Sequence, residues 1–319
     1  MAFNISNLII DKPKPIPILL LLDCSASMNV DGRINNLNDA VDEMLAIFQR
    51  EEKHTGRPFL VTLITFRGTK AEVLQPPAPV SEIRFTPLKA FSTTPLGSAL
   101  DKAFEIIEDR SLTPSRACRP IVILLCDGLP TDNWEPALLR FINGKRTSKC
   151  DRMALAVGEK LPAKAMEMLC AFLSGTGNQV IQASKAEGIV TFFKYVTMTV
   201  TLRTQSKSPD VLPTAVEIER AVKSLEEIQE EEFRKLVEEV EPLGFTQSAE
   251  VSAYIRNNHL GHRFPHISGT GTFLLGSNEW RFDGAISRRY YAKLCSVLHL
   301  SDQGSGAVMT NFSPFSQNK

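Results

Sequence analysis

Three short runs that are apolar almost throughout constrain the fold of this chain most strongly: Ile16–Leu22, Phe59–Phe66 and Ile121–Cys126. A half-exposed strand alternates apolar and polar residues, whereas a strand of a parallel sheet is buried on both faces and is apolar along its whole length. The segment Ile34–Phe48 follows the first run and carries apolar residues every three to four positions, which predicts a helix with one buried face. This alternation predicts an α/β fold with a doubly wound, mostly parallel sheet and helices on both faces.

The rest of residues 1–204 continues the alternation, and we assign them to one domain. The further predicted elements are an antiparallel edge strand, two parallel strands and three helices: Ala71–Gln75, Arg152–Val157, Gln179–Gln182, Pro95–Ile107, Pro162–Leu173 and Ala186 to about Thr201. Another helix follows Asp132, for which Asp132 and Glu135 predict a capping box.

Residues 205–319 form the second predicted part, a helical extension with a smaller α+β unit. A linker at 205–213 precedes a helix from Thr214 to about Glu241, with Glu217 placed to complete a capping box. A shorter helix at Ser248–Arg256, a hairpin turning at Gly276–Asn278 and a helix at Ser287–Leu298 are expected to follow.

Two clusters of the second part allow more than one interpretation. The aromatic residues are expected to form its small core, with a partner surface as the alternative: Trp280, Phe282, Tyr290 and Tyr291. Three histidines and one cysteine raise the alternative of a zinc site, although their spacing is irregular and a polar loop explains them as well: His259, His262, His266 and Cys295.

Composition excludes several classes of function. The 319 residues carry equal numbers of basic and acidic side chains, so the formal net charge is zero and no nucleic-acid or anionic-membrane partner is indicated. No apolar run is long enough to cross a bilayer. The six cysteines are scattered, and Cys118, Cys126 and Cys170 lie in or beside apolar stretches. Free core thiols of this kind are typical of a reducing cytoplasm, where we expect the protein to reside.

Oxygen-bearing side chains lie where strands end or helices begin. Asp23, Ser25 and Ser27 form a D-x-S-x-S cluster after the first apolar run, Thr94 opens the turn before a predicted helix, and Asp127 follows the run Ile121–Cys126. Ligands of such sheets bind at the carboxyl ends of the strands. Carboxylates and hydroxyls are the hard oxygen ligands that Mg²⁺ and Mn²⁺ prefer.

These segments resemble the metal-ion-dependent adhesion site of von Willebrand factor A (vWA) domains. The segments LLLDCSASM, TTPLGSAL and LLCDGLPTDNW are most similar to those of bacterial stand-alone vWA proteins of the TerY, tellurium-resistance type. The resemblance covers roughly the first 200 residues. It implies that Ser25 and Ser27 bind a metal directly, that Thr94 binds directly or through water, and that Asp23 and Asp127 hold coordinated waters or ligate the ion.

Other residues near this site have expected roles that are less specific. Arg67 and Lys70 follow the second strand on the same rim and are candidates for contacts with an acidic partner. Asp132 belongs to the family motif, but its predicted helix cap explains it equally well.

The resemblance implies a non-enzymatic, metal-dependent adaptor that binds an Asp or Glu of a partner protein, in a bacterial stress-response or antiphage defence system. Protein kinases, phosphatases and AAA+ ATPases are the expected partners. The alternatives are a Mg²⁺-dependent hydrolase or phosphotransferase, or a subunit of an AAA+ assembly. The sequence has no phosphate-binding G-x-x-x-x-G-K-[ST] loop and no G-x-S-x-G nucleophile elbow, so no catalytic residue is assigned.

Overall fold

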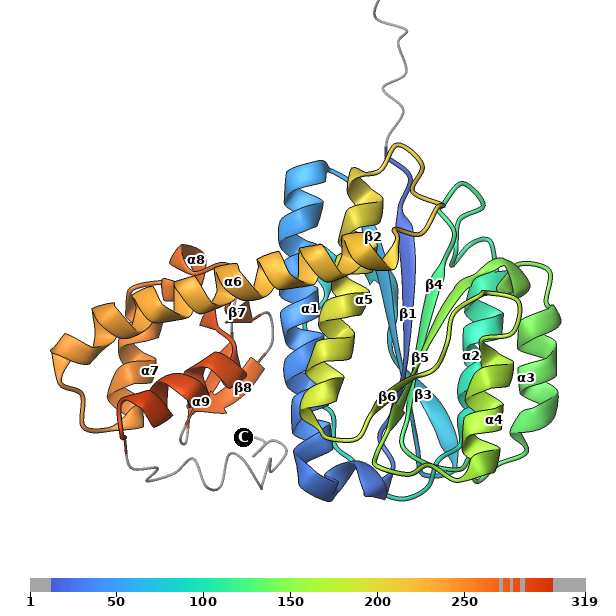
Figure 1. The fold of residues 1–319 in the computed structure, drawn as a ribbon, viewed down its shortest axis with the longest axis horizontal. Coiled ribbons are helices and arrows are strands. Elements are labelled where there is room, and N and C mark those ends of the chain that lie inside the picture. The colour runs from blue at the N-terminus through green and yellow to red at the C-terminus, as the bar shows by residue number, and fades with distance from the viewer. Residues whose placement is uncertain (1–12, 270–271, 276–277, 282–284, 301–319) are drawn as a thin grey trace, which may run out of the picture.

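The computed structural model describes residues 13–269, 272–275, 278–281 and 285–300. A six-stranded sheet lies between the helices of its N-terminal part (Figure 1). The strand order is β3-β2-β1-β4-β5-β6, and only β3 runs antiparallel to its neighbour. The strands are β1 Ile16–Asp23, β2 Phe59–Arg67, β3 Lys70–Pro79, β4 Ile121–Cys126, β5 Asp151–Val157 and β6 Ile181–Ala183. The predicted doubly wound, mostly parallel sheet is therefore confirmed.

Side chains on the two faces of this sheet enter two separate apolar layers. In β1, Leu20 and Leu22 pack into one layer, whereas Leu19 and Leu21 pack into the other. Because successive residues of a strand point to opposite faces, a strand covered on both sides must be apolar at every position. This requirement explains why β1 is buried from end to end.

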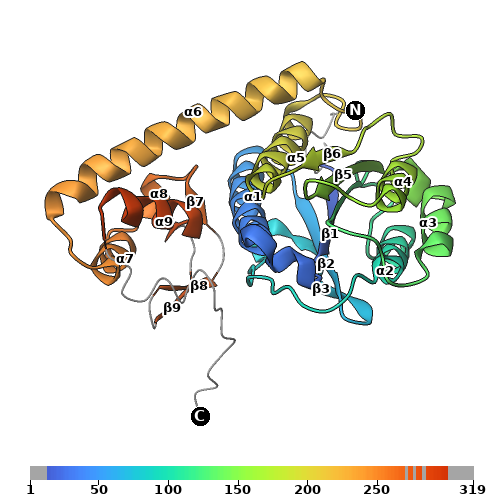
Figure 2. The same cartoon turned by 60° about the horizontal axis from the view of Figure 1, so that its bottom comes forward.

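Helices cover both faces of the sheet (Figures 1 and 2). One layer is closed by α1 Arg33–Thr55 and α5 Glu187–Gln205. The other is closed by α2 Leu96–Glu108, α3 Trp134–Asn143 and α4 Ala163–Phe172. Short 3-10 helices lie between these elements, at Ala26–Gly32 (η2), Val80–Glu82 (η3) and Thr147–Lys149 (η4).

Several sequence-based expectations needed correction in this domain. The edge strand β3 extends beyond the predicted Ala71–Gln75 and passes through Pro76 and Pro77, which an edge position tolerates because it leaves backbone N–H groups unused. The strand β6 begins later than expected, at Ile181. Cys118 and Cys126 are buried free thiols, but Cys170 is exposed on α4 and is not a core thiol.

The predicted capping box at Asp132 and Glu135 is also wrong. Helix α3 begins at Trp134 after Asn133, and no side chain caps it. The Asp132 carboxylate instead accepts hydrogen bonds from the backbone N–H groups of Gly97 and Ser98, each at 3.0 Å, in the first turn of α2. Asp132 therefore satisfies the free donors of a helix distant in sequence.

A long helix, α6 Ala215–Val240, carries the C-terminal part of the chain away from the sheet (Figures 1 and 2). It begins with the predicted capping box: the Thr214 hydroxyl accepts from Glu217 N at 3.3 Å, and a Glu217 carboxylate oxygen accepts from Thr214 N at 2.8 Å. The elements that follow are η5 Glu241–Leu243, α7 Ser248–Asn257, α8 Leu260–Arg263, β7 Ser268–Gly269, β8 Thr272–Leu275, β9 Asn278–Arg281, β10 Ala285–Ile286 and α9 Arg288–Val297.

The predicted hairpin is present as the antiparallel pair β8 and β9, with its turn at 276–277 outside the described residues. The strands β7 and β10 and the helix α8 were not predicted, because two to four residues are too short for a period to be recognised.

A separate apolar cluster forms the core of this C-terminal unit. Tyr290 and Tyr291 are buried in it, as the sequence predicts, and Phe233 of α6 contributes to it. The side chains of Trp280 and Phe282 lie outside the described part of the structure. The division into 1–204 and 205–319 stays a prediction. In the described part of the chain, no helix combines the length and the apolar character needed to cross a membrane.

Candidate metal centre

Two buried aspartates meet where the neighbouring strands β1 and β4 end. Leu22 pairs with Leu125 in the parallel register, so the residues that follow these strands emerge side by side. Asp23 is fully buried, and its two carboxylate oxygens accept hydrogen bonds from Ser25 N at 2.8 Å and from Asp127 N at 3.3 Å. Asp23 thus orients both segments that supply the remaining oxygens.

Three side-chain oxygens converge beside Asp23. Ser25 Oγ lies 3.0 Å from Ser27 Oγ and 3.4 Å from Asp127 Oδ1, and Ser27 Oγ lies 2.7 Å from the same Asp127 oxygen. Mg²⁺ ligands lie about 2.1 Å from the ion, so neighbouring ligands at right angles are about 3.0 Å apart. The spacing of these oxygens therefore fits one face of an octahedral site.

The segment that contains Thr94 is fixed to both of the others. Thr94 N donates to Thr131 Oγ1 at 3.1 Å, and Thr131 N donates to Thr94 O at 2.9 Å, which attaches it to the segment after β4. On the other side, Ala26 N donates to Ser92 O at 3.0 Å. Thr94 is buried in this arrangement. Four of the five predicted site residues therefore share one hydrogen-bonded cluster, namely Asp23, Ser25, Ser27 and Asp127, whereas Thr94 is joined to the neighbouring segment only through its backbone.

Burial and a neighbouring negative charge shift the pKa of Asp23. Removal from solvent, and then the nearby Asp127 charge, raise the pKa of Asp23 to about 7, although hydrogen bonds from Ser25 and Asp127 act in the opposite direction. Burial also raises the pKa values of the Cys24 and Cys126 thiols, which therefore stay protonated. The groups available to a cation are thus oxygens, and two adjacent carboxylates favour a positive charge between them.

Sequence analysis did not identify Arg33. Its Nη1 atom lies 3.2 Å from Asp127 Oδ2, the carboxylate oxygen that does not contact the serines. A cation in the first turn of a helix is electrostatically unfavourable unless it has a partner. Arg33 at the start of α1 could have been recognised by that signal. It neutralises part of the Asp127 charge and leaves the other oxygen facing the hydroxyls.

The predicted rim residues have different environments. Arg67 stacks over the Phe91 ring at 4.6 Å and donates to Lys89 O, so its guanidinium stabilises the loop that leads to Thr94. Lys70 is exposed at the start of β3. The Asp132 carboxylate already accepts hydrogen bonds from two backbone N–H groups of α2. Their predicted contacts with a partner stay a prediction.

The alternative zinc site receives no support from the geometry. Within the described residues, no group of three or more His, Cys, Asp or Glu side chains is arranged to hold a metal ion. His266 Nδ1 lies 2.6 Å from Glu232 Oε1 of α6, which explains this histidine as a structural contact.

Comparisons with known proteins cover part of the chain. Residues 18–129 match the family model of the von Willebrand factor type A domain. No curated protein matches the chain.

Among solved structures, similarity is found to proximal thread matrix protein 1 of the mussel byssus, at 18% identity over 58% of this chain and 48% of that one, with a TM-score of 0.45. A form of the same protein with a zinc-occupied MIDAS motif gives 16% identity over 58% and 48% and a TM-score of 0.46. The pilus adhesin SpaC of Lactobacillus rhamnosus GG gives 14% over 58% and 30%, also at 0.46. The matched part spans about half of the mussel protein. Residues 18–129 of this chain are thus similar to the von Willebrand factor type A domain family, and they lie within a doubly wound α/β fold.

Proposed function

We propose that this protein is a metal-dependent adaptor that binds an acidic side chain of a partner protein. The observation that carries the proposal is the triangle of Ser25, Ser27 and Asp127 oxygens beside the buried Asp23. Ser25, Ser27 and Asp127, with Thr94 directly or through water, would hold Mg²⁺ or Mn²⁺, and the ion would supply an open position for a carboxylate.

The charge balance of the site supports an anionic partner. The two serine hydroxyls are neutral, and Arg33 already compensates one oxygen of Asp127. A divalent ion held by these groups keeps an excess of positive charge. Ser27 is exposed whereas Asp23 is fully buried, so the accessible side of the site is the side with hydroxyls. Complementary charge across such an interface favours a partner's Asp or Glu.

The cellular role rests on the resemblance to TerY-type proteins. We infer a cytoplasmic protein of a bacterial stress-response or antiphage defence system, with a protein kinase, a phosphatase or an AAA+ ATPase as partner. The same resemblance favours an adaptor without catalytic activity. Turnover of a phosphate ester or ATP by the purified protein, lost in a Ser27→Ala variant, would contradict this view and favour the hydrolase alternative.

Metal binding tests the proposal directly. We expect calorimetry to show one Mn²⁺ or Mg²⁺ per folded chain. Asp23→Ala should abolish binding, and Ser27→Ala, a change at an exposed position, should weaken it about tenfold, as expected for one lost ligand. Asp109→Ala removes a carboxylate from an exposed turn beyond α2 and serves as the matched control.

Partner capture provides the second measurement. Proteins retained from a bacterial lysate in Mg²⁺ should be released by EDTA, and the Asp23→Ala protein should not retain them. Absence of metal binding to the folded wild-type protein would refute the proposal. EDTA-insensitive capture would show that partners bind elsewhere.

A further inference from the structure

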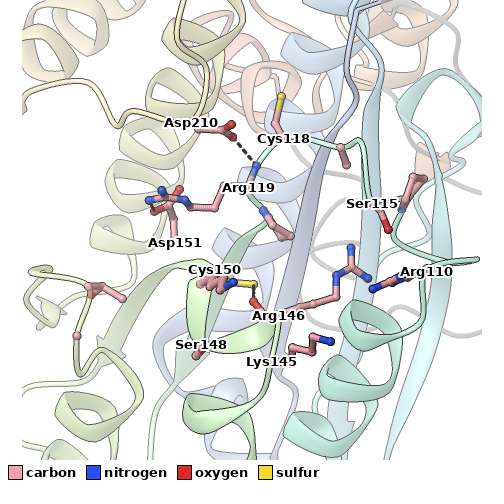
Figure 3. Close-up of a pocket in the computed structure, with 16 residues that line it drawn as sticks. Arg110, Ser115, Cys118, Arg119, Lys145, Arg146, Ser148, Cys150, Asp151 and Asp210 are labelled. Carbon is pink, nitrogen blue, oxygen red and sulfur yellow. Dashed lines mark hydrogen bonds and ion pairs between the residues drawn. The ribbon is translucent and has the colours of Figure 1, made fainter.

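A hollow lies at the end of the sheet opposite to the candidate metal centre, where the parallel strands β4 and β5 begin (Figure 3). It measures about 650 Å³, within the roughly 300–1,000 Å³ of small-molecule sites. Its walls come from the segments before the two strands, from the turn after α4 and from the 206–214 linker. No residue of the candidate metal centre lines it.

The lining of this hollow is strongly basic in a chain whose net charge is zero. Two carboxylates, Asp151 and Asp210, face five cationic side chains: Arg110, Arg119, Lys145, Arg146 and Lys149. A local excess of this size attracts anions from solution unless neighbouring residues compensate it.

Both carboxylates are already paired. Asp151 Oδ1 lies 3.4 Å from Arg119 Nη1, and Asp151 Oδ2 lies 3.3 Å from Arg203 Nη1. Arg203 is fully buried behind the hollow, and its Nη2 atom lies 3.8 Å from Asp210 Oδ1. Asp210 also accepts a hydrogen bond from Arg119 N at 2.6 Å. The two acids therefore neutralise the arginines on their own side of the hollow and leave the other side uncompensated.

The uncompensated side contains Arg110, Lys145 and Arg146, which Figure 3 shows together, away from Asp151 and Asp210. Arg146 is fixed by neutral acceptors: its Nη1 atom donates to Ile107 O, and its Nη2 atom donates to Thr113 O at 2.7 Å. Carbonyl oxygens orient the guanidinium without cancelling its charge.

Two acids lie on this side. Glu108 Oε1 accepts backbone hydrogen bonds from Arg146 at 2.7 Å and from Thr147 at 3.0 Å. The pKa of Asp109 is lowered by hydrogen bonds from Ser111 and also by the Arg146 charge. Together with Lys149, the cations of this side number four, so these two carboxylates leave an excess of positive charge. In the part of the chain that the structure describes, no carboxylate forms an ion pair with Arg110, Lys145 or Lys149.

Donor groups are also in excess at the next residue of β5. Arg152, next to Asp151 in β5, is 2% exposed, and its Nε and Nη1 atoms have no acceptor among the described residues. Its Nη2 atom donates to Ser174 O, directly before Gly175 and Thr176 of the hollow's lining. Burial raises the pKa of the Cys150 thiol to about 12, so that this lining group adds no negative charge at neutral pH.

We propose that this hollow binds an oligophosphate chain, such as the triphosphate of a nucleotide or inorganic tripolyphosphate. Such a chain carries several charges and many acceptor oxygens in a small volume. It therefore matches separated cations around a hollow better than a single carboxylate does. The planar guanidinium groups of Arg110 and Arg146 suit phosphate oxygens in particular. A nucleic-acid backbone is disfavoured because it needs a broader basic surface than a neutral chain offers.

Calorimetry with inorganic tripolyphosphate and with ATP, in metal-free buffer, tests this site independently of the metal centre. We expect one binding site per chain. Arg110→Ala and Lys145→Ala should each weaken binding about tenfold, the effect of removing one charge-assisted hydrogen bond. Lys145→Arg should retain binding. Lys185→Ala removes an exposed charge beyond β6, at the other end of the sheet, and should leave the affinity within twofold of wild type.

Comparison of tripolyphosphate with ATP shows which part of the ligand is recognised. Equal affinities would show that the phosphate chain alone is recognised, and tighter ATP binding would show that the nucleoside contributes. Both substituted side chains are exposed, so we expect each variant to fold like the wild type. Thermal melting checks this expectation. Absence of binding, an equal loss in Lys185→Ala, or binding of an oligoglutamate peptide but not of tripolyphosphate would overturn the proposal.

Discussion

The sheet domain and the C-terminal unit are stabilised in different ways. The sheet domain buries two apolar layers, one on each face of β1 and β4, and each layer is continuous along the sheet. The C-terminal unit has one small apolar cluster and meets the sheet domain through a small apolar patch. The buried members of this patch are Ile47, Met198, Ile218 and Leu225. Apolar burial scales with area, so this junction provides much less of it than the sheet does.

Polar contacts supply the rest of the junction. Arg288 Nη2 lies 2.9 Å from Asp39 Oδ1 of α1, and Arg289 Nη1 lies 3.5 Å from Glu43 Oε2 of the same helix. Arg50 of α1 donates to Pro265 O. Such contacts depend on orientation and compete with water. The comparison teaches that the sheet domain is stabilised mainly by apolar burial, whereas the position of the C-terminal unit depends to a larger extent on polar contacts.

The largest expected effect comes from a large-to-small change in each core. Ile123→Ala in β4, at a fully buried position, should lower the free energy of unfolding by about 2–5 kcal/mol. Leu294→Ala in α9 is equally buried but should disrupt the C-terminal unit alone. Urea unfolding followed by circular dichroism, together with hydrogen exchange of β1 and β4, distinguishes the effect of Ile123→Ala from that of Leu294→Ala. Loss of protection in β1 on Leu294→Ala would show that the two regions unfold as one.

A smaller effect is expected from breaking the junction at Arg288. Arg288→Ala leaves Asp39 largely buried without this partner, which should weaken docking by about 2 kcal/mol. The stability of the sheet itself should not change. Small-angle scattering should show a larger radius of gyration, and Arg234→Ala, which removes exposed ion pairs within α6, serves as the control. An unchanged radius in the presence of a stability loss would show that the contact stabilises the sheet domain instead.

The smallest effect is a pH dependence of docking through Glu43. Burial, opposed by Arg289 and reinforced by Asp39, raises the pKa of Glu43 to about 7 from its usual 4.5. A carboxyl with a raised pKa binds its proton more tightly in the docked state. Docking is therefore strongest below about pH 4.5 and weakens as the pH rises to about 7. We expect several-fold greater hydrogen exchange in β7 and α9 at pH 8 than at pH 5, after correction for intrinsic rates.

Glu43→Gln provides the control for this pH dependence, because an amide of the same shape does not titrate. The variant should show the same protection at both pH values. A pH dependence that survives the substitution would assign the effect to Asp39 or to another acid of the junction.

The sequence by itself indicated the α/β class, the succession of the main strands and helices along the chain and the candidate residues of the metal centre. Runs such as Ile16–Leu22 have one stable environment, a sheet covered on both faces, and the carboxyl ends of parallel strands lie at one edge. Asp23 and Asp127 were therefore placed together by topology alone. The capping box at Thr214 was equally predictable, since it uses neighbouring residues only.

Only the tertiary structure decided which partners these side chains take. Asp132 caps α2 and not α3, Arg33 pairs with Asp127, and the basic hollow assembles from four segments distant in sequence. The spacing of apolar residues likewise did not predict the docking of the C-terminal unit on α1. The physical reason is that local patterns fix which face of an element is buried, whereas ion pairs and hollows depend on how separate elements are positioned in space.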